Sequence, residues 1–367
     1  INMSDIKVTI IGVGGAGCNT INRLSSKKFK HYNLLAVNTD TQMLETIKHS
    51  DVFALGPMTT KGFGSGGNPR IGRLAAKESS EQFSKLLEGQ DLVILTTGLG
   101  GGTGTGATPV LASLAKKMGA LVIVIATLPF NFEGQIRAQY SEKAVKSLIR
   151  SADSLIQINN DGLLGTMDKK STIDASFKYA DNALMDIVEE ITTVIGNSGL
   201  INIDFADIKN LLTKSGKTYV SKSRINKSEQ IDTIHENLKQ NLLINYGFRS
   251  SRRLLLSIKS SPDFSLNELN LIATKVSSFL YNPENILIGV NNTFFKKSII
   301  EATLIASDLK FSFTNDTLPV EPKPFSYISS KYSNAQSVNN ISNSNDSAIK
   351  MGILNLRKLI KIPIGFN

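Results

Sequence analysis

The chain has 367 residues, of which 41% are apolar, a length and composition typical of two domains with hydrophobic cores. No apolar run reaches membrane-spanning length, the N-terminal residues show no signal peptide, and Cys18 is the single cysteine. These features exclude a disulfide scaffold and favour a soluble, cytoplasmic protein. Three scattered histidines without paired spacing predict no His/Cys metal site.

The net charge of +10 is unevenly distributed. Residues 1–210 hold 21 Lys and Arg against 20 Asp and Glu, a net of +1, whereas residues 211–367 hold 20 against 11, a net of +9. The excess is thinly spread and accompanies no nucleic-acid-binding motif, so we expect no specific nucleic-acid partner. Weak attraction to anionic surfaces stays open.

The first 160 residues alternate between buried apolar runs and helical stretches. Such alternation favours an α/β domain with a doubly wound parallel sheet. The expected strands cover residues 7–12, 34–37, 91–96, 121–127 and 154–158, and the expected helices include 69–87, 109–118 and 136–151.

A long helix is expected over about 173–195, and the pattern changes after it. Strand-like runs at 253–259, 285–290 and 299–306, with a helical period at 266–280, predict a smaller α+β unit. From about residue 315 the chain is rich in Ser, Asn and Pro, which predicts a disordered linker before an apolar, basic tail. The expected parts are an N-terminal domain at 1–172, a central helix at 173–198, a C-terminal domain at 199–314, a linker at 315–350 and a tail peptide at 351–367.

Two glycine-rich segments follow separate strands of the expected sheet. The first, GVGGAG at 12–17, matches GxGxxG, and Asp40 lies 23 residues after Gly17, as in a dinucleotide-binding oxidoreductase. A tight strand-to-helix turn would give the same pattern. The second, GLGGGTGTG at 98–106, precedes a helix that we expect to open at Pro109. Two backbone anion cradles fit a compact polyphosphate gripped from both sides better than they fit a dinucleotide.

Neither segment carries the lysine of a P-loop, and the chain has no GxxxxGK[ST]. If a nucleotide is hydrolysed here, the catalytic charge must therefore come from residues outside these loops.

Together, these loops resemble those of a known family, the tubulin-like cell-division GTPases of the FtsZ type. GGGTGTG at 100–106 is similar to the family's signature loop, and GVGGAGCN at 12–19 to its first phosphate loop. AVNTD, KGFGSGGNP, PFNFEGQIR and NND resemble further loops of the site. GLINIDFADIK at 199–209 is similar to the loop that these proteins insert into a neighbour's nucleotide site.

The resemblance implies a tubulin-like fold, a GTPase activity with GTP and Mg²⁺, and a nucleotide site built from several loops. It assigns Asn19 and Asn160 to the base, Phe177 to stacking on guanine, and Asp181 to the two adjacent guanine donors. Glu133 and Arg137 would contact ribose and α-phosphate. The remaining implied contacts are main-chain donors and threonine hydroxyls in the two glycine loops, at Gly14, Gly15, Ala16, Gly17, Gly100, Gly101, Gly102, Thr103, Gly104 and Thr105.

Spacing alone leaves plainer alternatives for several of these residues. Phe177 could pack in the core, and Asp181 could be a solvated helix carboxylate. Glu133 and Arg137, four residues apart, could form a surface ion pair. Asp204 and Asp207 could cap a helix.

Asp204 and Asp207 are, by resemblance, the catalytic carboxylates that one subunit supplies to the next. The resemblance further implies head-to-tail filaments that form a division ring at midcell, and a tail that docks membrane-tether proteins. Two departures bear on this: Arg70 stands where the family usually has a glutamate, and segment 214–229 lacks the usual motifs. An alternative is therefore a divergent tubulin-like partner that binds GTP and co-assembles but hydrolyses little.

Overall fold

The computed structural model describes residues 6–25, 29, 32–164, 172–196, 200–226, 231–239, 249–280, 283–292, 295 and 299–309. The predicted linker and tail, at 315–350 and 351–367, lie outside the described residues. Among the described helices, none is both long and apolar enough to cross a membrane.

The N-terminal half forms a seven-stranded parallel sheet in the order β3-β2-β1-β4-β5-β6-β7. This confirms the predicted doubly wound sheet. The strands are β1 (Val8–Val13), β2 (Asn33–Asn38), β3 (Asp51–Ala54), β4 (Leu92–Gly98), β5 (Leu121–Leu128), β6 (Ser154–Asn159) and β7 (Gly216–Lys217).

Alternate residues of the central strands pack on opposite faces of this sheet. In β4, Leu92 and Ile94 face the core shared with the C-terminal part, whereas Val93 and Leu95 face a second core. Both faces are covered, which explains why these strands read as continuous apolar runs.

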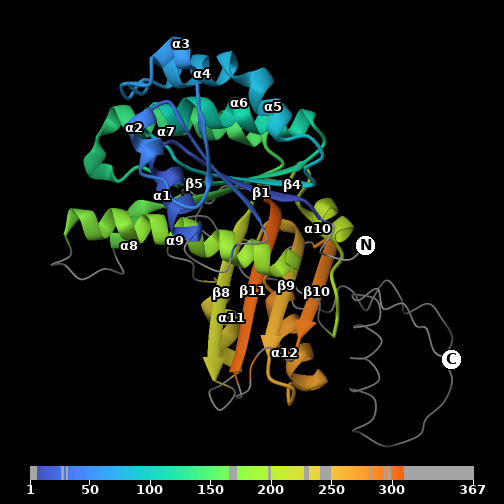
Figure 1. The fold of residues 1–367 in the computed structure, drawn as a ribbon. Coiled ribbons are helices and arrows are strands. Elements are labelled where there is room, and N and C mark those ends of the chain that lie inside the picture. Colours follow the sequence, from blue (N-terminus) through green and yellow to red (C-terminus); the bar gives the residue numbers. More distant parts are fainter. Residues whose placement is uncertain are drawn as a thin grey trace, which may run out of the picture.

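Two groups of helices cover the two faces (Figure 1). On one face pack α1 (Gly14–Ser25) and the long α9 (Ile173–Gly196). On the other lie α4 (Pro69–Glu78), α5 (Ser80–Leu86), α6 (Thr103–Lys117) and α7 (Gln135–Ser151). The expected single helix at 69–87 is thus two helices, because Ser79 leaves the helical conformation at φ −87° and ψ 6°.

The C-terminal part is a four-stranded mixed sheet in the order β10-β9-β11-β8, below α9 in Figure 1. It comprises β8 (Tyr219–Asn226), β9 (Ser251–Ser260), β10 (Asn285–Asn291) and β11 (Ile299–Leu309), with α11 (Asp232–Lys239) and α12 (Leu266–Ser277). The smaller α+β unit is therefore as predicted, although β8 and α11 were not expected from the sequence.

Two buried carboxylates, Glu190 and Glu301, organise the ion pairs between α9 and this sheet. Glu190 of α9 binds Lys222 of β8 and accepts a 2.8 Å hydrogen bond from Thr303 of β11. Glu301 bridges Lys222 and Lys259, each at 3.2 Å. Because buried charges are costly unless paired, this network fixes the position of the central helix on the sheet.

Candidate nucleotide site and the opposite edge of the sheet

The strand order reverses between β1 and β4, which are neighbours in the sheet. Helix α1 begins directly after β1, and α6 begins five residues after β4, so two helix N-termini meet at this point. A Cβ on Gly14 would lie 3.0 Å from the Gly104 nitrogen, so the two loops touch. Crevices at such switch points are where doubly wound folds bind ligands, and helix N-termini favour anions.

The glycines of the second loop have two different physical roles. A Cβ on Gly102 would lie 2.2 Å from Ser65 Oγ, and one on Gly106 only 2.0 Å from the Pro69 carbonyl oxygen. These glycines allow the loop and α6 to approach the 65–69 loop and α4. Around Gly15 and Gly101, by contrast, a Cβ would meet nothing within 4 Å. Gly15 and Gly101 therefore border the open space in which a ligand would lie.

Helix α6 begins at Thr103, so the expected opening at Pro109 is wrong. Pro109 lies one turn and a half inside the helix, and the first turn belongs to the glycine loop itself. The two threonine hydroxyls form internal bonds: Thr103 Oγ1 lies 2.6 Å from Thr39 Oγ1, and Thr105 Oγ1 accepts from Gly100 N at 2.8 Å. The proposed phosphate contacts of these hydroxyls remain a prediction.

Asn19 and Asp181, which are 162 residues apart in sequence, meet between α1 and α9. Asn19 Nδ2 donates to Asp181 Oδ2 at 3.3 Å, and Arg23 Nη2 lies 3.4 Å from the same oxygen. Asp181 is only 8% exposed, so the solvated-carboxylate alternative is wrong. Burial raises the pKa of Asp181 to about 6, although Arg23 and Asn19 act in the lowering direction.

Phe177 lies at the surface of α9 and is 40% exposed, so the core-packing alternative is also wrong. Its ring stands edge-on to Phe130 and Phe132, with centroids 5.4 and 6.3 Å away. Phe132 is itself 60% exposed. Phe130 is buried, so two exposed rings, Phe132 and Phe177, stand on a buried one. Phe177 lies four residues before Asp181, and a planar base could add to these exposed rings by stacking.

Glu133 and Arg137 form the ion pair that their spacing allows. A Cβ on Gly100 would lie 3.2 Å from Arg137 Cβ, so this pair borders the second glycine loop. Asn160 begins α8 (Asn160–Leu164) at the carboxyl end of β6. Its side-chain oxygen is buried and has no hydrogen-bond partner among the described residues, as expected of a group awaiting a ligand donor.

Asp40, the acidic residue of the dinucleotide alternative, and the single cysteine both have structural roles. Asp40 caps α2 (Thr41–Glu45), where its carboxylate accepts from Gln42 N and Met43 N. The carboxylate of this supposed ribose ligand is therefore occupied by the backbone. Cys18 is buried, and burial raises the pKa of its thiol to about 12, so it is not a reactive group.

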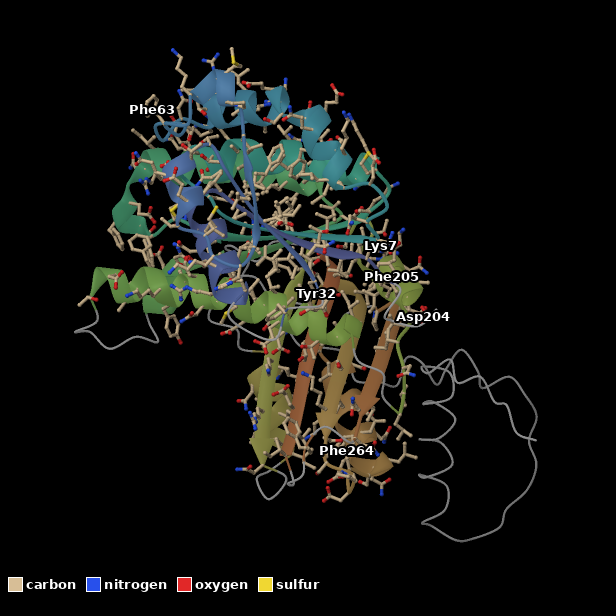
Figure 2. All side chains as sticks on the ribbon, viewed as in Figure 1. Lys7, Tyr32, Phe63, Asp204, Phe205 and Phe264 are labelled. Atoms are coloured by element: carbon tan, nitrogen blue, oxygen red, sulfur yellow. The ribbon has the colours of Figure 1, made fainter. Side chains whose placement is uncertain are left out.

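Asp204 and Asp207 lie at the other edge of the sheet. Asp204 caps α10 (Phe205–Leu212), accepting from Asp207 N at 2.7 Å. Ser215, just after α10, donates to the Asp153 carbonyl at 2.8 Å, and Asp153 immediately precedes β6. A six-residue strand is about 20 Å long, so β6 separates α10 from the carboxyl edge. In Figure 2, Asp204 and Lys7, the residue before β1, lie on one side of the view, and Phe63 lies on the other.

No cluster of three or more His, Cys, Asp or Glu side chains able to hold a metal occurs in the described part of the chain. Mg²⁺ is commonly bound through phosphates, waters and one or two carboxylates rather than a complete protein cage. The site is thus compatible with Mg²⁺ that arrives with a triphosphate.

Arg23 was not foreseen from the sequence, yet it contacts Asp181 and donates to Asn182 Oδ1 at 2.6 Å. Its place one helical turn after Asn19 was the available signal. Phe132 was likewise not singled out, although it lies in the same motif as Phe130 and Glu133.

The family model "Tubulin/FtsZ family, GTPase domain" matches residues 7–168. The chain is 36% identical to the cell division protein FtsZ of Pseudomonas aeruginosa over 303 residues, which cover 82% of this chain and 77% of the relative. It is 38% identical to cell division protein FtsZ 1 of Pyrococcus abyssi, over 77% and 76% of the two chains.

The solved structure "FtsZ dimer, empty" from M. jannaschii superposes with a TM-score of 0.76 at 32% identity, covering 87% of this chain and 95% of that one. CetZ2 from Haloferax volcanii, in a GTPγS-bound protofilament, gives a TM-score of 0.73 at 20% identity, which shows the fold alone. The fold is that of tubulin-like GTPase-domain proteins. Within that class, this chain belongs to the tubulin/FtsZ family.

Proposed function

We propose that this protein binds and hydrolyses GTP and assembles head-to-tail into the filaments of a cytoplasmic division ring. The observation that carries the proposal is the separation of two half-sites on opposite edges of one sheet. The glycine loops and the base-side residues share the carboxyl edge, whereas Asp204 and Asp207 lie at the amino edge.

On the nucleotide side, the main-chain donors at the starts of α1 and α6 would hold the phosphates, with Gly15 and Gly101 leaving room for them. The Asp181 carboxylate would accept from two adjacent guanine donors, a pattern that adenine does not offer. Phe177 would stack on the base, and Asn160 and Asn19 would complete its polar contacts. Glu133 and Arg137 would approach the ribose and α-phosphate.

On the other side, a rigid strand keeps the two aspartates away from their own glycine loops. They can meet a γ-phosphate only in a neighbouring molecule, where they would orient and polarise the attacking water. Mg²⁺ bound to the phosphates would offset their negative charge. A head-to-tail contact of this kind does not close on itself and therefore propagates as a filament.

Exposed apolar side chains at both edges favour such a contact. Phe63 is 84% exposed and Phe132 60% exposed at the nucleotide edge, and Leu200 is 72% exposed shortly before α10. Burying these groups in a junction would stabilise the filament, and loss of the γ-phosphate after hydrolysis would weaken it.

The test is phosphate release by the purified protein as a function of its concentration, with sedimentation in GTP and in GDP. We expect the rate per molecule to rise with concentration and the pellet to require GTP. A rate per molecule that is constant down to concentrations without pelletable polymer would overturn the shared-site proposal. Negligible turnover with normal GTP-dependent pelleting would instead support a co-assembling protein that hydrolyses little.

A further inference from the structure

A groove of about 800 Å³ runs along α6, between α4 and α7, on the face of the sheet away from α9. Its lining begins at Thr105 in the first turn of α6 and ends at Lys117, the last residue of that helix. From Thr105 to Lys117 the helix rises about 18 Å, which is enough to seat three turns of a second helix. Figure 1 shows α4, α5, α6 and α7 together on this side of the sheet.

The two sides of the groove are strongly basic. Basic residues at helical spacing on α4 form one side, and basic residues at helical spacing on α7 form the other. The last residue of α6 adds one more cation. The six basic side chains that line the groove are Arg70, Arg73, Lys77, Lys117, Lys143 and Arg150.

All six of these cations are exposed, and none forms an ion pair within the part of the chain that the structure describes. Neighbouring surface lysines behave differently: Lys85 pairs with Glu81, and Lys146 pairs with Glu142. Residues 1–210 have a net charge of only +1, so the basic groove is a local concentration of charge. Unpaired like charges repel one another, and an anionic occupant would relieve that repulsion.

The floor of the groove is apolar, with Pro109, Val110 and Leu114 of α6 and Ala144 of α7. An apolar floor between two cationic sides matches an amphipathic helix with a carboxylate-bearing upper face. Tyr140 is the single aromatic residue in the lining, so the groove has no series of rings on which bases could stack. The chain's own tail contains Arg357, Lys358 and Lys361 and no acidic residue, so its charge does not complement the groove.

We propose that the groove between α4, α6 and α7 is a docking site for an acidic amphipathic helix of a partner protein. Apolar side chains of that helix would lie on Val110 and Leu114, and its carboxylates would pair with the cations of α4 and α7. Because the groove ends at Thr105, in the first turn of the helix that borders the nucleotide, an occupant would contact the back of the proposed phosphate cradle.

The probe is a fluorescein-labelled 14-residue peptide with leucines at i, i+3, i+4 and i+7 spacing and glutamates at most other positions. Binding to the full chain is followed by fluorescence anisotropy at moderate salt. We expect saturable binding that weakens about tenfold or more in the Arg73→Glu/Lys143→Glu variant. The matched control, Lys85→Glu/Lys146→Glu, changes the net charge equally on exposed helix positions outside the groove and should bind as the unmodified protein does.

Two further probes distinguish docking from general charge attraction. A peptide with serine in place of each leucine keeps the charge, and we expect it to bind at least about fivefold more weakly because the apolar floor is unused. A labelled 15-mer of deoxythymidine tests a nucleic-acid occupant. The proposal would be overturned if both double variants lost the same affinity for the peptide. It would also be overturned if the serine peptide bound as tightly as the leucine peptide, or if the oligonucleotide bound more tightly than the peptide.

Discussion

Asp181 is buried against α1, and within the described part of the chain its carboxylate has two side-chain partners, Asn19 and Arg23. Burial raises the pKa of this carboxyl to about 6, so in the ligand-free protein it takes up a proton at a higher pH than an exposed aspartate does. A guanine base, with two adjacent donors, would supply hydrogen bonds that only the carboxylate can accept.

We therefore expect GTP affinity to fall as the pH decreases through about 6, by up to about tenfold per pH unit, because protonated Asp181 must first lose its proton. The Asp181→Asn variant should lack this step and should lose about tenfold to hundredfold of its preference for GTP over ATP. Dissociation constants of both proteins are measured at each pH, and their ratio removes the titration of the phosphates themselves. An unchanged GTP preference in Asp181→Asn would contradict the assignment.

Asp204 and Asp207 differ in their structural roles, which allows their proposed catalytic roles to be separated from stability. Asp204 caps α10, whereas the Asp207 side chain is not the cap. We expect Asp207→Ala to keep GTP binding and to lower turnover about hundredfold or more.

Asp204→Asn retains a capping oxygen and should lower turnover without unfolding the protein. Asp204→Ala should lower turnover and also cost about 1 kcal/mol of stability. Phosphate release and urea unfolding report the two effects, and wild-type turnover by Asp207→Ala would exclude the mechanism.

At the scale of elements, α4 and α6 approach so closely that their contact depends on glycine. Gly106 faces the Pro69 carbonyl oxygen and Arg73 nitrogen, at 2.0 and 2.7 Å from an ideal Cβ. Gly101, five residues earlier, faces open space. One glycine run thus serves helix packing at one end and ligand access at the other.

Substitution of Gly106 should lower the stability of the fold, whereas substitution of Gly101 should lower GTP binding. Gly106→Ala should destabilise the fold by about 1–3 kcal/mol or more, because the methyl group forces α4 and α6 apart. Gly101→Asp should have the same free energy of unfolding as the unmodified protein. It should lose GTP binding, because its carboxylate would repel the phosphates. Gly101→Ala is the neutral control and should retain more binding than Gly101→Asp does. Normal GTP affinity in a folded Gly101→Asp protein would refute the cradle at this loop.

At the scale of the whole molecule, the parallel sheet determines which groups can act together. Every strand of the N-terminal sheet runs in one direction, so the glycine loops share one edge and α10 is attached at the other. Neither half of the proposed active site can reach its complement within the same chain. In the proposed mechanism, assembly and catalysis are therefore coupled by geometry.

Mixing two inactive variants tests this coupling. Gly101→Asp should lack the nucleotide half-site and Asp207→Ala the catalytic half-site, so each alone should release little phosphate. If both enter one filament at random, about a quarter of the junctions combine an intact nucleotide site with an intact α10. We expect an equimolar mixture to recover up to about that fraction of the unmodified rate. A mixture no more active than its separate components, although it co-sediments, would rule out sharing between subunits.

Much of the fold was predictable because its central strands are buried on both faces. Runs such as VTII in β1 and LVIL in β4 can be recognised as strands without knowing which segments pack against them. The edge strand β3 was missed because it is short and mostly exposed. Strand β8 was missed because Ser, Lys and Arg alternate through it, and the structure explains Lys222 there only through Glu190 and Glu301.

The sequence by itself determined the alternation of strands and helices, the two glycine loops after β1 and β4, and the family. These follow from residues close together in the chain, where periodicity and loop chemistry operate. The tertiary structure alone decided that Asp181 is buried beside Arg23, that Phe177 is exposed, and that six cations line one groove. Burial, pKa and the distance between half-sites depend on packing between segments far apart in sequence, which no local pattern encodes.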